Sequence, residues 1–130
     1  MNLGPYSMSR LRAKATLYNV CSDFRDPLIN YLVHGWLPGS FMSSVLADAG
    51  WAAIQHCHPA NNIQEMKNMV VWIINEFPRE ARGSLEKVRD WSELSHTERR
   101  AILHREGLIY TEEEELMLIL KHGPDPVVIV

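Results

Sequence analysis

This sequence has little that is typical of secreted or membrane proteins. Its 130 residues include only two cysteines, Cys21 and Cys57, which are too few for a disulfide framework. No apolar run approaches the roughly 18 residues of a membrane-spanning helix. The first residues contain no apolar signal-peptide core. We therefore expect a protein of the cytoplasm that does not associate with membranes.

Known catalytic motifs are absent as well. The sequence contains no G-x-S-x-G, no glycine-rich nucleotide fingerprint, no H-E-x-x-H and no evident pair of catalytic carboxylates. This favours a protein that binds rather than catalyses, and that needs no cofactor. An enzyme with an unrecognised site, built on His34 or His56, is the alternative.

The basic excess of proteins that coat DNA or RNA is missing too, because the formal net charge is -3. The charge is nevertheless uneven. Residues 1–25 carry four basic residues and one acid, whereas residues 95–130 carry four basic residues and seven acids. The two ends could attract each other, within one chain or between chains. A regulator that binds nucleic acid through Arg10, Arg12 and Lys14 stays an alternative, because a local basic face suffices for modest binding.

The overall composition is that of an ordinary folded domain, with 46% hydrophobic and 22% charged residues. Its length suits one domain over residues 1–130. Residues 1–8 and 124–130 are candidate flexible or exchanged ends. The last four residues, Val127 to Val130, are β-branched and could form a short strand, either packed on the core or exchanged with another subunit.

Apolar residues recur at three- and four-residue steps, which predicts helices. We expect them over about 9–22, 27–34, 41–49 and 61–77, with shorter ones after Ser84, Ser95 and Thr111. Possible further turns follow at 51–57. The fold class is therefore all-α, an orthogonal bundle of six to eight short helices with 61–77 at its centre. Five residues should be largely buried: Leu32, Phe41, Val45, Trp72 and Ile73.

Polar residues and glycines mark where these helices begin and end. Ser9, Asp26 and Ser40 are expected N-caps, with Pro27 as a first helical residue and Gly35 as a stop. Ser95 with Glu98 and Thr111 with Glu114 have the spacing of capping boxes, and Asn62 with Glu65 is similar. Leu116 and Leu120 should pack on the core or on a partner chain.

Two helix starts are candidate anion sites, because the first N–H groups of a helix point outward. One is Pro38-Gly39-Ser40. The better supported one is Gly83-Ser84, where basic residues stand nearby: Arg79, Arg82 and Lys87. A simple capped turn is the alternative at both places. Trp36, beside the Pro-Gly turn, should be partly exposed and could anchor an interface.

Metal binding is not expected. His56, Cys57 and His58 are adjacent, and three adjacent helical residues cannot all face one ion. The acids Glu112 to Glu115 point around a helix and should form a solvated first turn. His96 and His104 lie eight residues apart and could share a helix face, but no carboxylate has a spacing that predicts an acid–base pair.

The stretch 27–46 contains His34-Gly35, then Pro38-Gly39-Ser40-Phe41-Met42 and Val45-Leu46. Over residues 27–91 the chain resembles a set of small bacteriophage and prophage proteins, whose pattern is close to this one: a hydrophobic helix, His-Gly, two residues, Pro-Gly-Ser/Gly-Phe-Leu and Ala-Val-Leu. The stretches 71–78 and 83–91 are similar to a second pattern of the same proteins. That pattern is an aromatic helix, a turn that contains proline, and then G-S-x-E-x-V-x-x-W. The family usually carries Asn-Asp-Leu where this chain has Ala47-Asp48-Ala49, and the residues after 94 are not covered.

The resemblance implies a phage accessory protein that acts inside an infected bacterium. Such a protein would inhibit a host or defence protein, or sequester a small anionic, nucleotide-like ligand, and could be a homo-oligomer. A virion or assembly component is a further alternative.

Overall fold

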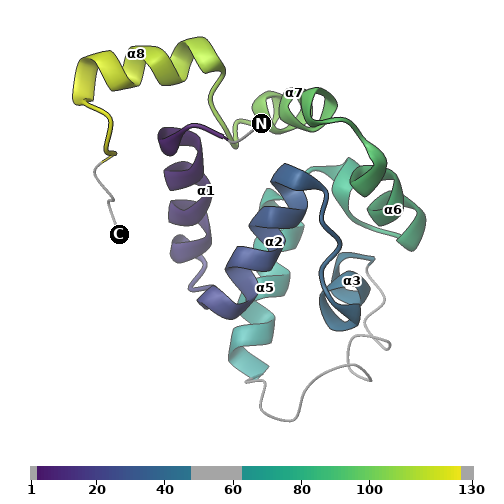
Figure 1. The fold of residues 1–130 in the computed structure, drawn as a ribbon. Coiled ribbons are helices and arrows are strands. Elements are labelled where there is room, and N and C mark those ends of the chain that lie inside the picture. The colour runs from purple at the N-terminus through teal and green to yellow at the C-terminus, as the bar shows by residue number, and fades with distance from the viewer. Residues whose placement is uncertain (1–2, 48–62, 127–130) are drawn as a thin grey trace.

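The computed structural model describes residues 3–47 and 63–126. Within these ranges the chain forms seven α-helices and one 3-10 turn, and no strand (Figure 1). The predicted all-α bundle of six to eight short helices is confirmed. The elements are α1 (Pro5–Leu17), α2 (Ser22–His34), α3 (Ser40–Leu46), α5 (Ile63–Glu76), the turn η1 (Arg79–Ala81), α6 (Leu85–Glu93), α7 (His96–Arg105) and α8 (Glu112–His122).

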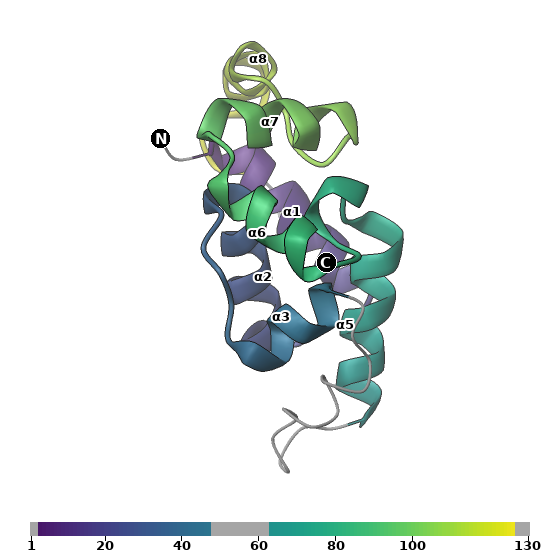
Figure 2. The same cartoon turned by 90° about the vertical axis from the view of Figure 1, so that its right-hand side faces the viewer.

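Helix α2 forms the middle of the bundle, with α1 and α7 in contact with it (Figures 1 and 2). It buries six residues, whereas α5 buries three. The sequence predicted the centre at 61–77, because that segment is the most apolar. The structure differs because α5 lies at the edge and leaves Ile63, Val71 and Ile74 exposed.

The core is closed by large aromatic side chains that also satisfy buried backbone groups. The indole N–H of Trp91 donates to the carbonyl of Tyr31 at 3.1 Å, and the Tyr31 hydroxyl donates to the carbonyl of Ala81 at 2.7 Å. Burial raises the pKa of the Tyr31 hydroxyl far above its ordinary value, so it stays a donor. These bonds tie α2 to α6 and to η1.

The predicted core is confirmed in part. Leu32, Trp72 and Ile73 are buried, but Phe41 and Val45 are only partly buried. Both belong to α3, a helix of seven residues whose only buried residue is Leu46. The Phe41 ring lies 5.9 Å from the ring of Phe24, so it covers the core from outside.

Two of the predicted helix starts are wrong. Helix α1 begins at Pro5 with Gly4 as its N-cap, not at Ser9, and α2 begins at Ser22 with Cys21 as its N-cap. Pro27 therefore lies inside α2. Because proline has no backbone N–H, the carbonyl of Asp23, four residues earlier, has no donor within the helix. Asp23 is exposed, so water can take that place.

The predicted end of the first helix at about Ser22 is wrong too, because α1 ends at Leu17. The other predicted helix ends are mostly confirmed. Both capping boxes, at Ser95 and at Thr111, form in full. The Ser84 hydroxyl accepts from the N–H of Lys87. Gly35 ends α2 in the left-handed conformation, at φ 72°. Ser40 is the exception, because it is the first residue of α3 and Gly39 is the cap.

Helix α8 is attached to α1 through a buried carboxylate. Glu115 accepts hydrogen bonds from the N–H groups of Ser7, at 2.5 Å, and Tyr6, at 3.2 Å. The Tyr6 hydroxyl donates to the carbonyl of Gly123 at 2.7 Å, which fixes the other end of α8. The prediction of a solvated acidic turn is thus wrong for Glu115. The two oppositely charged ends do meet within the chain, through a helix terminus rather than through ion pairs.

Several predictions fall outside the described residues. They concern Asp48 and Ala49, the turns at 51–57, the His56-Cys57-His58 cluster, the cap at Asn62 and the tail 127–130. Among the helices of residues 3–47 and 63–126, none combines the length and the hydropathy that a membrane span requires.

Candidate functional site

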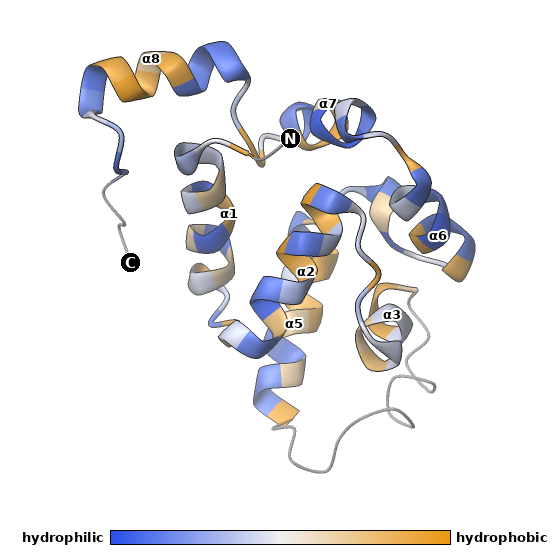
Figure 3. Ribbon diagram, viewed as in Figure 1, coloured by the Kyte–Doolittle hydropathy of each residue, from blue (hydrophilic) through white to orange (hydrophobic). Residues whose placement is uncertain are grey.

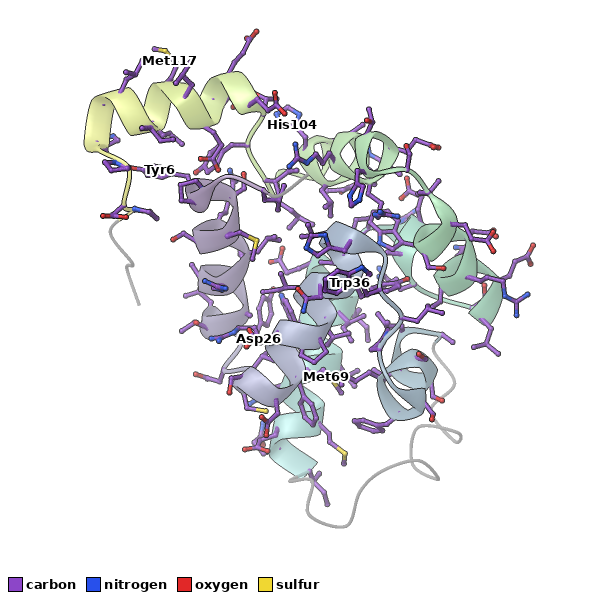
Figure 4. The ribbon with its side chains drawn as sticks, viewed as in Figure 1. Tyr6, Asp26, Trp36, Met69, His104 and Met117 are labelled. Carbon is purple, nitrogen blue, oxygen red and sulfur yellow. The ribbon has the colours of Figure 1, made fainter. Side chains whose placement is uncertain are left out.

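Two large apolar side chains stand exposed on the turn between α2 and α3. Trp36 is 62% exposed and Leu37 is 57% exposed. The prediction that Trp36 is partly exposed is therefore confirmed. In Figure 4, Trp36 lies beside α2, on the side of α3 and α6. An exposed tryptophan next to a leucine on a short turn is a typical anchor for a protein interface.

The turn is held in place by Arg99, which is buried beneath it. Its Nε donates to the carbonyl of Val33 at 3.2 Å. Its Nη1 donates to the carbonyls of Trp91, at 3.3 Å, and of Leu94. A Cβ atom on Gly35 would lie 2.6 Å from Nη1, so only glycine fits there. Arg99 thus fastens the C-terminal ends of α2 and α6 below Trp36.

Trp36 is also held from one side by a row of imidazole rings. The His34 ring stacks on Trp36 with centroids 4.5 Å apart and planes at 23°. The His96 ring stands edge-on to His34 at 6.0 Å. Burial lowers the pKa of His34, and the neighbouring His96 lowers it further. Loss of hydration and Arg99 lower the pKa of His96. Both rings are therefore mostly neutral at pH 7.

His96 also borders a cavity of about 310 Å³ between α7 and the loop that follows it. The lining includes Ala101 and His104 of α7, and Ile109 and Tyr110 of the loop. The predicted shared face of His96 and His104 is consistent with this lining. A second cavity of about 300 Å³ lies against Leu3, Glu115 and Ile119 of the α1–α8 contact.

The positive groups at these cavities are paired with acids. Arg100 lies 3.3 Å from Glu112, and His104 Nε2 lies 2.8 Å from Glu114. Hydrogen bonds from Thr111 and from His104 lower the pKa of Glu114, so the pair is ionic whenever His104 is protonated. Nothing in the sequence predicts this pair, because the turn between α7 and α8 sets the distance. With these charges compensated, the cavity favours a neutral side chain over a phosphate.

The residues of the predicted anion site at Gly83-Ser84 are largely engaged within the chain. The Arg82 guanidinium donates to the carbonyls of Phe77, at 3.3 Å, and Ile74, at 3.1 Å. The N–H of Gly83 donates to the carbonyl of Leu46 at 2.8 Å. Arg79 and Lys87 are exposed. Arg82 therefore satisfies carbonyls at the C-terminal end of α5. Its guanidinium is not directed at the start of α6, where an anion would bind.

The second predicted anion site, Gly39-Ser40, does not lie next to the first one. Gly83 bonds to Leu46, at the C-terminal end of α3, whereas Gly39 and Ser40 lie at the opposite end of that helix. Both are exposed. No side-chain hydrogen bond caps α3, and the Ser43 hydroxyl donates to the carbonyl of Pro38 instead.

The basic residues proposed for nucleic-acid binding are also largely engaged. The Arg10 guanidinium lies over the Tyr110 ring, 4.9 Å from its centroid. Lys14 lies 3.6 Å from Glu76. Arg12 is exposed. Among residues 3–47 and 63–126, Arg10 and Lys14 thus have partners, and Arg12 is the most accessible cation of the three.

No group of three histidine, cysteine, aspartate or glutamate side chains could hold a metal ion among residues 3–47 and 63–126.

Comparisons with protein-family models, with curated proteins and with solved structures each found no match.

Proposed function

We propose that this protein is a non-catalytic binding protein that docks on another protein through its Trp36 surface, formed by His34, Trp36, Leu37 and His96. The observation that carries this proposal is the 62% exposure of Trp36 on a turn that Arg99 and His34 hold in place. A rigid aromatic side chain loses little conformational entropy when a partner covers it.

The surface has the chemistry of an interface centre. It combines an exposed Trp and Leu with two neutral imidazoles. The adjacent cavity of about 310 Å³ could accept one apolar side chain of the partner. Interface centres are typically poor in charged residues and rich in aromatic ones.

The resemblance of residues 27–91 to phage proteins supports a partner in the infected bacterium. We propose a host or defence protein that is inhibited when the Trp36 surface covers its working face. Sequestering of a small anionic ligand has less support, because the guanidinium of Arg82 already binds two carbonyls. Regulation through nucleic acid has less support, because Arg10 and Lys14 have partners within the chain.

The proposal can be tested by site-specific photo-cross-linking in bacteria that express the protein. A photo-reactive amino acid replaces Trp36 in one variant. In the control it replaces Leu85, which is 63% exposed on α6. We expect one defined host protein to cross-link at position 36 and not at position 85. Cross-linking to the same proteins at both positions, or to none at position 36, would contradict the proposal.

A further inference from the structure

Helix α8 presents an apolar face that the rest of the described chain does not cover. Leu116, Met117 and Leu120 are 56%, 65% and 73% exposed. They belong to a run of five apolar residues in a helix of 11. Figure 3 shows this apolar band on a helix that stands out from the bundle. Exposed apolar side chains that gather on one helix face normally mark a contact surface.

The orientation of this face is fixed. Glu115 on the opposite side of α8 is 7% exposed, and it caps the start of α1. Tyr6 binds the carbonyl of Gly123 at the far end of the helix. The helix therefore cannot roll to bury Leu120 without breaking both attachments. Because the described residues do not cover the face, it is open to a second molecule.

Charged residues at the two ends of the face indicate which molecule this is. Glu113 lies four residues before Met117, and Lys121 lies four residues after it, so the three form one row on the helix. Neither charge takes part in an ion pair of the described residues. Along the helix, this row consists of an acidic, an apolar and a basic residue.

We propose that the α8 face pairs with the α8 face of a second copy of this chain, antiparallel, about a two-fold axis near Met117. This arrangement places Glu113 of each copy beside Lys121 of the other, because the two are equally far from Met117. It also opposes the two helix dipoles. A parallel pair would place like charges together, and a lipid surface would meet the acidic first turn of α8.

The size of the face sets the expected affinity. Helix α8 is about 16 Å long, so two such helices bury less than the roughly 800 Å² per partner of a standard interface. The dimer is therefore weak, with a dissociation constant on the order of micromolar. The Trp36 surface takes no part in this pairing, so the two proposals stand or fall separately.

Sedimentation equilibrium of the full chain tests the pairing, with Glu113→Lys and Lys121→Glu as paired variants. Each variant alone sets like charges against each other, and its dimer dissociation constant should rise about tenfold or more. An equimolar mixture of the two should restore the dimer, because every contact then joins opposite charges. Both positions are exposed, so folding should be unaffected, and circular dichroism checks this.

Concentration-dependent dimers of the wild type, weakened in each variant and restored in the mixture, establish antiparallel pairing. A wild type that stays monomeric at every concentration up to about 1 mM overturns the proposal, because that lies far above the expected dissociation constant. Dimers that respond equally to the two variants but are not restored in the mixture also overturn it.

Discussion

At the scale of single residues, Arg99 is the buried cation on which the candidate site depends. It is 3% exposed, and its hydrogen bonds go to main-chain carbonyls of α2, α6 and the residue after α6. The C-terminal ends of helices carry partial negative charge. The C-terminal ends of α2 and α6 both point their carbonyls at Arg99. Together they stabilise its positive charge, as a carboxylate would in an ion pair.

We expect Arg99→Met to lower the free energy of unfolding by about 2–4 kcal/mol, because it leaves several buried carbonyls without a donor. Urea denaturation followed by circular dichroism measures the change. The control is Arg89→Met on the exposed side of α6, which should change stability little. If both variants unfold at the same urea concentration, Arg99 does not fasten the two helix ends.

His34 makes stability depend on pH. Its pKa in the folded state lies below its ordinary value of about 6.5, because burial and His96 disfavour the charged form. The unfolded chain therefore binds the proton more readily. The contribution of neutral His34 is fully present above pH 6.5, and it is lost as the pH falls toward the folded-state pKa.

Comparing the wild type with His34→Gln isolates this effect, because the other titrating groups are common to both. Between about pH 7 and pH 5 the wild type should lose more stability than the variant, as measured by urea denaturation. Equal losses would mean that His34 is not desolvated in the folded protein.

At the scale of elements, caps made by neighbouring residues could be predicted and caps made by distant residues could not. Ser95, Thr111 and Ser84 cap their helices through N–H groups three residues away, and the sequence shows that spacing. The cap of α1 comes from Glu115, more than 100 residues away in sequence. Nothing in the N-terminal sequence predicts this contact, and Ser9 is the best cap candidate that the local sequence offers.

We expect Glu115→Gln to lower the free energy of unfolding by about 1–2 kcal/mol, because the start of α1 loses its negative charge and a buried acceptor. The variant should be compared with Glu113→Gln, an exposed acid of the same helical turn, at a concentration too low for pairing. Thermal unfolding measures both. If Glu113→Gln lowers the free energy of unfolding as much as Glu115→Gln does, the effect does not depend on the contact between Glu115 and α1.

The same distinction holds for the candidate site. The Pro-Gly turn predicts the exposure of Trp36, and the eight-residue spacing predicts that His96 and His104 lie on one side of α7. The fastening of the turn by Arg99 depends on how α2, α6 and α7 pack, so the sequence could not predict it. Arg82 shows the reverse case, because its spacing suggests an anion site while packing directs it to carbonyls of α5.

At the scale of the whole molecule, the two proposals concern separate surfaces. The Trp36 surface lies at the C-terminal end of α2, next to the start of α7, and the α8 face lies on the helix that stands out from the bundle (Figures 1 and 4). Pairing through α8 would join two Trp36 surfaces in one particle. Two linked surfaces bind a partner that repeats its site much more tightly than one does.

The central claim is that Trp36 anchors a protein partner, and the affinity of the cross-linked host protein for purified variants tests it most directly. Trp36→Ala should weaken binding by about 30-fold or more, the loss typical of a buried interface tryptophan. Leu85→Ala, which removes an equally exposed side chain elsewhere, should leave the affinity unchanged. If Trp36→Ala binds the host protein as tightly as the wild type does, the Trp36 surface is not the binding site.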